Sequence, residues 1–202
     1  MPKNTRLKPQ MRARIATAAA RIMAEDGIED FASAKRKAAR QLGAQFTEML
    51  PTNEEIEGEL RIYQSLYQHD EHHERVRLFR LRALDAMRAL ERFRPYLVGP
   101  VLSGTAGRYS DIGLQVFTDD SKALEFELLN RNLAYEVSEK RRFCGDSERA
   151  VPVLRVDWDG ITLDIEMYSA RDERGTLQTS ASGKPIARAG LPAVAQLLAD
   201  DA

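Results

Sequence analysis

Apolar residues in the first half of the chain recur every three or four positions, which is the spacing of one helix face. This pattern predicts a helix from Met11 to the turn before Gly27, and a second from the cap at Asp30 to Gly43. A third is predicted after Thr52, which forms a capping box with Glu55. A fourth runs from about residue 71 to 93, where a following proline ends it. The first half is therefore predicted to be helical.

After Pro95 the pattern changes to short apolar runs separated by turn residues, which is typical of strands. Strands are predicted at 96–98, 112–117, 133–137, 153–158 and 161–168, with a helix over 121–130. The pair Asp159-Gly160 predicts a hairpin between the last two strands. Residues 172–190 are polar and predict a loop, before a short helix from Leu191. We expect an α+β fold with a helical domain over 1–95, a small mixed-sheet core over 96–170, and a loop and short helix over 171–202.

Charge is balanced overall but not along the chain. The 202 residues hold 30 basic and 31 acidic side chains, a formal net charge of -1. Residues 1–42 contain ten basic and four acidic side chains, so this segment carries +6 and the remainder -7. The asymmetry favours a polyanionic partner such as RNA at the N-terminal helices. With one cysteine, no membrane-length apolar run and no signal-like N-terminus, we expect a cytoplasmic protein.

The segment 97–117 combines features of a phosphate-binding turn. An apolar run enters a glycine-rich turn, and Asp111 then opens a second apolar run. Glycines let the backbone approach an anion closely, and a carboxylate at the start of a strand can hold magnesium. In the later strand 161–168, alternation places Asp164 and Glu166 on the same face. These three acids are the candidate metal ligands.

This segment resembles the signature of the nucleotidyltransferase superfamily related to DNA polymerase beta, in which a Gly-Ser turn is followed by Asp-x-Asp. The positions that fit are Gly99, Gly104, Ala106, Ser110 and Asp111. Pro100 stands where the signature has Ser, and Gly113 stands where it has the second acid. The resemblance extends over about residues 96–168, where the order of turn, strands, helix and hairpin also follows that family's minimal core.

The resemblance implies transfer of a nucleoside monophosphate from a nucleoside triphosphate to a hydroxyl acceptor, with Mg²⁺. Asp111, Asp164 and Glu166 would then be the catalytic and metal-binding residues. The phosphates would be held by Gly99, Ser103, Gly104, Thr105 and Ser110. Pro100 has neither the hydroxyl nor the amide donor that Ser supplies, and Gly113 supplies no ligand. A catalytically inactive module that binds nucleotide or RNA, or a protein-interaction subunit, is therefore an open alternative.

The fourth predicted helix carries a cationic face that also has two interpretations. Its members within a third of the circumference are Arg77, Arg80, Arg88 and Arg92. They form either a solvated face paired with nearby acids, or a surface for RNA or a triphosphate tail. Asp111 could likewise be only a turn residue, and Asp164 and Glu166 only solvent-facing acids on an edge strand.

Overall fold

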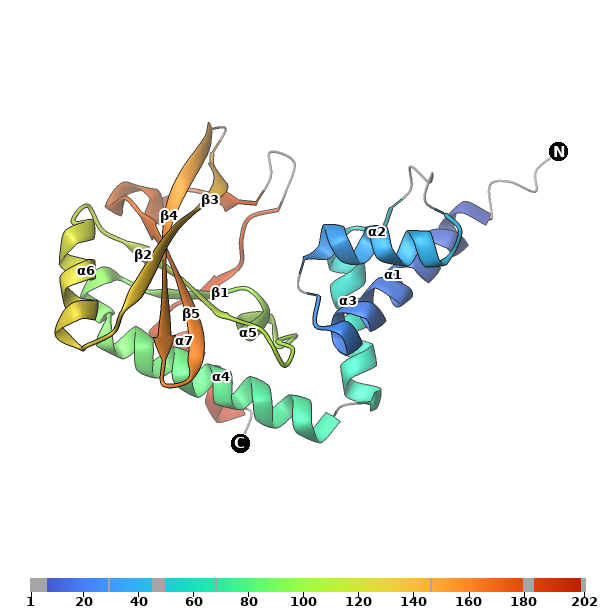
Figure 1. Ribbon diagram of the computed structural model, residues 1–202, viewed down its shortest axis with the longest axis horizontal. Coiled ribbons are helices and arrows are strands. Elements are labelled where there is room, and N and C mark those ends of the chain that lie inside the picture. The colour runs from blue at the N-terminus through green and yellow to red at the C-terminus, as the bar shows by residue number, and fades with distance from the viewer. Residues whose placement is uncertain are drawn as a thin grey trace. The chain divides into compact units, whose positions relative to one another are not determined.

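The computed structural model describes residues 7–28, 30–44, 50–67, 69–145, 147–179 and 184–200 (Figure 1). Helices precede a mixed seven-stranded sheet, so the expected α+β class is confirmed. The chain forms two compact units: a helical unit, residues 1–75 with 105–110, and a sheet unit, residues 76–104 with 111–202. This grouping differs from the predicted division at residue 95, because most of the fourth helix belongs to the sheet unit.

The helical unit contains α1 (Leu7–Asp26), α2 (Phe31–Gln41), α3 (Asn53–Tyr67) and the start of α4 (His69–Ala89). The predicted caps form: the Asp30 carboxylate accepts from Ala32 N and Ser33 N, and Thr52 and Glu55 exchange hydrogen bonds. Its core packs small and branched side chains from α1, α2 and α3, including Ile15, Ala19, Ala38, Ile56 and Leu60. No helix in the described part of the chain is both long and apolar enough to cross a membrane.

The sheet unit contains the rest of α4 and two segments of 3-10 helix, η1 (Glu91–Phe93) and η2 (Ala170–Arg174). Its helices are α5 (Pro100–Ser103), α6 (Ser121–Asn130) and α7 (Leu191–Asp200). Its strands are β1 (Tyr96–Val98), β2 (Ile112–Phe117), β3 (Tyr135–Cys144), β4 (Ser147–Trp158), β5 (Ile161–Tyr168), β6 (Leu177–Gln178) and β7 (Arg188–Ala189). The order across the sheet is β6-β3-β4-β5-β2-β1-β7. Only the central β2–β5 pair among these strands is parallel.

Two sequence expectations need correction. The strands β3 and β4 extend well beyond the predicted 133–137 and 153–158, because β3 continues through residues 138–144 and β4 includes residues 147–152. These residues lack an apolar alternation, since most of their side chains are exposed. The segment 172–190 is not only a loop: it contributes part of η2 and both edge strands, β6 and β7. The predicted Asp159-Gly160 turn is confirmed, with φ of 56° and 83° at its two residues.

The sheet is curled so that its two edge strands approach each other. Pro185 is paired with Gln178, and Ile186 N donates to Leu177 O at 2.7 Å, so the chain there lies beside β6. Two residues after Ile186, Arg188 is paired with Val98 of β1, at the opposite edge of the strand order. Two residues span at most about 7 Å. The sheet must therefore bend around one of its faces, which we call the inner face.

The two faces of the sheet differ in what covers them. On the outer face, Trp158 donates to Asp85 of α4, and Tyr135 donates to Glu125 of α6, so these helices cover it. Figure 1 shows α4 and α6 alongside the strands. The inner face is closed at one end by apolar and aromatic side chains from several strands: Phe117, Val151, Tyr168 and Leu177, with Tyr96, Cys144 and Ile186 packed against them. Nearer the start of β2, the inner face is polar.

Candidate functional site

Strand register arranges the residues of the inner face, among them the predicted Asp164 and Glu166, in rows across neighbouring strands. The outer row, nearest the start of β2, consists of Gly113, Asp164 and Arg155. The middle row consists of Gln115, Glu166 and Val153, and the inner row contains Phe117 and Tyr168. Because rows are two residues apart, successive rows are separated by about 7 Å.

Asp111 and Asp164 are brought together by one guanidinium group. Arg155 Nη2 lies 2.9 Å from Asp111 Oδ2 and 3.2 Å from Asp164 Oδ2, and Arg155 Nε donates to Asp164 Oδ1 at 2.8 Å. Since both Nη2 distances start from the same atom, the two carboxylate oxygens lie at most about 6 Å apart, the sum of those distances. The sequence-predicted pair of acids therefore meets in the structure, with a cation between them.

Glu166 lies one row deeper and has different partners. Its carboxylate accepts from Arg142 Nε at 3.2 Å and from the Tyr168 hydroxyl at 2.7 Å. Lys140 Nζ lies 2.8 Å from Asp164 Oδ2 and 4.0 Å from Glu166 Oε1. Both cations come from β3 and reach across β4 to the acids of β5. Three carboxylates and three basic side chains thus form one charge-neutral cluster.

The cluster shifts the pKa values of its two aspartates in opposite directions. Burial raises the pKa of Asp111, and the neighbouring Asp164 charge raises it further, against the opposing effect of Arg155. Burial would also raise the pKa of Asp164, but hydrogen bonds from Arg155 and Lys140 outweigh it, so this pKa lies below its usual range. Asp164 is therefore the firmly ionised partner and Asp111 the more readily protonated one.

This donor set does not fit the magnesium site that the resemblance implies. A hard cation needs several free oxygen ligands, whereas both oxygens of Asp164 and both of Glu166 already accept hydrogen bonds from other side chains. Gly113 supplies no ligand in the outer row. Across the ranges that the structure describes, no three Asp, Glu, His or Cys side chains are grouped to hold a metal ion. We therefore derive no step through a metal.

The departure at residue 100 has a local structural reason. Gly99 has φ 74° and ψ -154°, a backbone conformation that residues other than glycine rarely adopt. It directly precedes the single-turn helix α5. Pro100 occupies the first position of α5, where its fixed φ suits the helix. An N–H at this position would have no partner within the helix, so its absence costs no helical hydrogen bond. Ser103 closes the turn, because its N–H donates to Gly99 O at 3.1 Å. Proline here favours the turn while removing a phosphate donor.

The remaining predicted phosphate-binding residues have structural contacts of their own. Gly104 has φ 77°, and a Cβ there would lie 3.3 Å from Arg80 Nη2. Thr105 and Ser110 belong to the helical unit. Thr105 O accepts from the buried Gln64, and Ser110 Oγ accepts from Gly107 N at 2.8 Å. Their phosphate-binding role stays a prediction.

Val98 leaves little room for a side chain at residue 113, where the signature has its second acid. A Cβ built on Gly113 would lie 3.1 Å from Val98 Cγ2 and 3.4 Å from Val98 O, which is closer than ordinary contact. An acid at this position would therefore require Val98 to move. The close packing of β1 against β2 therefore favours glycine over an acid at residue 113.

Of the four arginines on the predicted cationic face, Arg80 of α4 and Arg92 of η1 are held by contacts within the sheet unit. Arg80 is buried and donates to the carbonyls of Val101 and Leu102. Arg92 donates to Ala123 O and lies 3.1 Å from Glu127. Arg77 and Arg88 are exposed. In the helical unit, Arg12, Arg21 and Lys37 form ion pairs with Glu55, Glu25 and Asp26, so these cations are matched by acids.

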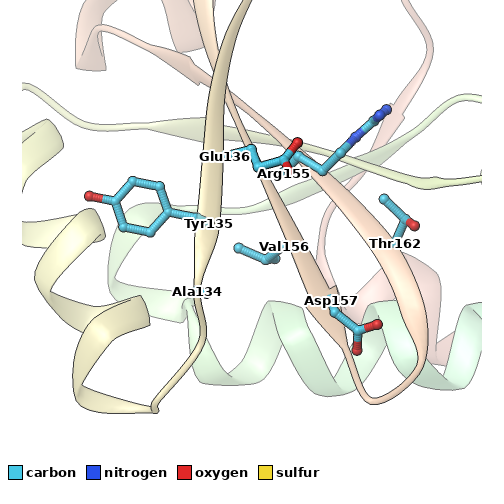
Figure 2. A pocket seen from close by; sticks show the side chains of 7 residues that line it. All are labelled: Ala134, Tyr135, Glu136, Arg155, Val156, Asp157 and Thr162. Atoms are coloured by element: carbon cyan, nitrogen blue, oxygen red, sulfur yellow. The ribbon is translucent and has the colours of Figure 1, made fainter.

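A shallow pocket of about 250 Å³ lies next to the cluster and shares Arg155 with it. Its lining residues are Ala134, Tyr135, Glu136, Arg155, Val156, Asp157 and Thr162. Figure 2 shows Tyr135 and Val156 on one side of the strands, and Arg155, Asp157 and Thr162 on the other. The lining contains two acids and one cation, so it does not favour an anionic ligand.

Four polar residues of the inner face were missed in the sequence: Lys140, Arg142, Arg155 and Gln115. Lys140 and Arg142 fall in the part of β3 that the pattern did not predict. Arg155 lies in a predicted strand, and its alternation with the buried Leu154 and Val156 was the available signal. The sequence did not single out Gln115, because one polar residue within an apolar run usually lies on the exposed side of a strand.

Comparison with known proteins gives little beyond this geometry. No protein-family model matches the chain, and no curated protein matches it. Among solved structures, the chain is similar to one described as a cytoplasmic RNA terminal U-transferase, with 23% identity and a TM-score of 0.34. The match covers 53% of this chain and 33% of that chain, so this protein spans about a third of the enzyme it matches. A TM-score of this size does not establish a common fold.

Proposed function

We propose that the chain is a nucleotidyltransferase-like module that binds a nucleoside triphosphate without a metal ion, through Arg155 and Lys140. The observation that carries this proposal is the matching of three inner-face acids by three basic side chains. In this arrangement the acids hold the cations in place, and the cations are the groups available to a ligand.

Exposure supports this division of roles. The side chains of Arg155 and Lys140 are 48% and 39% exposed, whereas that of Asp164 is 8% exposed. Both cations are anchored by two-point or short contacts to a buried carboxylate, which restricts their rotamers before any ligand binds. A polyphosphate can then bind to the exposed N–H groups with little additional ordering.

The neutral total charge of the cluster limits the affinity. Phosphate oxygens must compete with Asp111 and Asp164 for the same N–H donors, so we expect a dissociation constant on the order of 0.1–1 mM. Salt should weaken binding, because the contact is between charged groups that are partly exposed.

The experiment compares Arg155→Gln with Arg141→Gln. Arg141 lies between Lys140 and Arg142 on β3, but its side chain is 81% exposed and pairs with Glu148. In calorimetric titration with ATP, GTP, CTP and UTP in EDTA, we expect Arg155→Gln to weaken binding about tenfold, the loss of one charge-assisted contact. Arg141→Gln should bind like wild type.

Fluorescence of Trp158, the only tryptophan, checks that each variant is folded, because it lies in the sheet unit. Equal binding by wild type and Arg155→Gln would overturn the proposed site. Binding of RNA that does not depend on Arg155 would favour a different surface of the protein.

Magnesium-dependent nucleotidyl transfer is the second candidate function. It is favoured by the approach of Asp111 and Asp164 to within about 6 Å, which is the arrangement that the resemblance predicts. For this function the carboxylates would have to exchange their cationic partners for a metal ion. Formation of labelled pyrophosphate from a triphosphate, lost in Asp111→Asn, would establish it.

A further inference from the structure

One edge of β3 is open over most of its length. The register of β3 with β4 runs without interruption from Tyr135 to Cys144, whereas β6, on the other side, pairs only with Phe143 and Cys144. In the part of the chain that the structure describes, no strand pairs with residues 135–142 on that side. Every second residue of this segment therefore directs its backbone N–H and C=O groups to the open edge, which is about 27 Å long.

This edge lacks two common protections against pairing with another strand. Residues 135–142 contain no proline, and their continuous register with β4 leaves no place for a bulge. Residues 136–139 are all exposed, and the apolar Val137 is 66% exposed. A long, regular strand edge that carries an exposed branched apolar side chain is suited to pairing with a further strand.

The charges along the open edge are complementary to those of a second copy of the same strand. An acid, Glu136, lies near its start, and the bases Lys140 and Arg141 lie near its end. In an antiparallel pair centred on Ser138, Glu136 lies directly opposite Lys140 of the second copy, and both belong to the inner face. Opposite charges at such cross-strand positions stabilise the pair, and two-fold symmetry provides this contact twice.

Neighbouring centres of symmetry give poorer pairs. A centre on Glu139 places two glutamates opposite each other, and a centre on Lys140 places two lysines opposite each other. A centre on Val137 leaves Glu136 opposite Ser138, with no charge pairing between them. With the centre on Ser138, the paired segments are residues 135–141 of both copies. They end before Phe143, so β6 keeps its place on β3.

We propose that two copies of the chain pair through the open edge of β3, centred on Ser138, into a two-fold dimer with one continuous sheet. This dimer does not depend on nucleotide binding. The Lys140 ammonium lies 2.8 Å from Asp164, and its side chain is 39% exposed, so it remains accessible to Glu136 of the second copy. Because one short strand pair is a small interface, we expect a dissociation constant on the order of 10–100 µM.

The first test is sedimentation equilibrium of wild type, Glu136→Lys and the control Glu74→Lys. Glu74 is exposed and lies in the helical unit, so its substitution makes the same change in net charge outside the sheet unit. We expect wild type to dimerise as its concentration rises. Glu136→Lys should weaken the dimer about tenfold or more, because it replaces two attractive pairs by two lysine pairs. Glu74→Lys should dimerise like wild type.

The second test is disulfide formation by Ser138→Cys, compared with Arg141→Cys, each in a Cys144→Ser background that removes the native thiol. In the proposed dimer, residue 138 lies opposite itself, with Cβ atoms about 5 Å apart. Residue 141 lies six positions, or about 20 Å, from its own counterpart, which is too far for a disulfide. We expect mild oxidation to give a covalent dimer of Ser138→Cys and to leave Arg141→Cys monomeric.

Three results would overturn the inference. They are a wild type that stays monomeric up to about 500 µM, several times the expected dissociation constant, a dimer that is unaffected by Glu136→Lys, and a disulfide that forms as readily through residue 141 as through residue 138. Fluorescence of Trp158 checks that each variant is folded. If Glu136→Lys does not fold, wild-type sedimentation and the two cysteine variants still decide between dimer and monomer.

Discussion

At the scale of single residues, Asp111 and Asp164 contact the same guanidinium but contribute to stability in opposite pH ranges. The pKa of Asp111 is raised by burial and by Asp164, so its contribution is fully present below the ordinary Asp pKa, about 4, and is lost as the pH rises through its folded value. The pKa of Asp164 is lowered by its cationic partners despite burial. Its contribution is present above about pH 4 and is lost as the pH falls through its folded value.

The corresponding substitutions should therefore diverge with pH. Asp111→Asn should match wild type near pH 4 and become the more stable protein as the pH rises to 7, because it removes an unfavourable ionisation. Asp164→Asn should be the less stable protein at pH 7, by about 2 kcal/mol, because two cations lose a buried partner. Urea unfolding followed by Trp158 fluorescence measures both. A stability difference that does not change with pH would contradict this electrostatic interpretation.

The sequence allowed the acids of this cluster to be predicted, but not their partners. Asp111, Asp164 and Glu166 stand at positions where alternation and the glycine turn predict a shared face. The long side chains of Lys140 and Arg142 reach across the intervening strand to contact Asp164 and Glu166. Such a contact depends on the order of strands in the sheet, and no local pattern reports it.

At the scale of elements, the packing of β1 against β2 explains why residue 113 is glycine. The contact between a new Cβ and Val98 Cγ2, at 3.1 Å, predicts that Gly113→Ala destabilises the sheet unit by about 1 kcal/mol. The cost should fall by at least about 0.5 kcal/mol in a Val98→Ala background, because the contacting methyl group is absent. Trp158-detected urea unfolding of the four proteins of this cycle provides the measurement. An unchanged cost in both backgrounds would mean that Val98 does not exclude a side chain at 113.

Most elements were predictable because their signals are local. The caps at Asp30 and Thr52, the helical spacing of α3 and the Asp159-Gly160 turn each depend on a few neighbouring residues. The strands β6 and β7 are two residues long and lack any periodic pattern. They are strands only because the edges β3 and β1 offer unpaired backbone groups, so tertiary structure determines them.

At the scale of the whole molecule, the curl of the sheet decides the chemistry of the inner face. It encloses Gln115, Glu166 and Asp164, which an open sheet would expose to water. Enclosure strengthens the ion pairs of Asp164 and Glu166, and it increases the cost of leaving the buried Gln115 amide without a hydrogen bond. The sequence predicted the class of fold but not this enclosure, because the curl arises from the pairing of residues near 178 and 188 with opposite edges.

The most direct test of the account is nucleotide binding by wild type and Asp111→Asn, each measured in EDTA and in magnesium. Because Asp111 competes with phosphate for Arg155 Nη2, the account predicts that both proteins bind in EDTA, with Asp111→Asn binding up to about fivefold more tightly. Magnesium should not be required. Binding that occurs only with magnesium and is abolished in Asp111→Asn would contradict the account and identify a metal-dependent site instead.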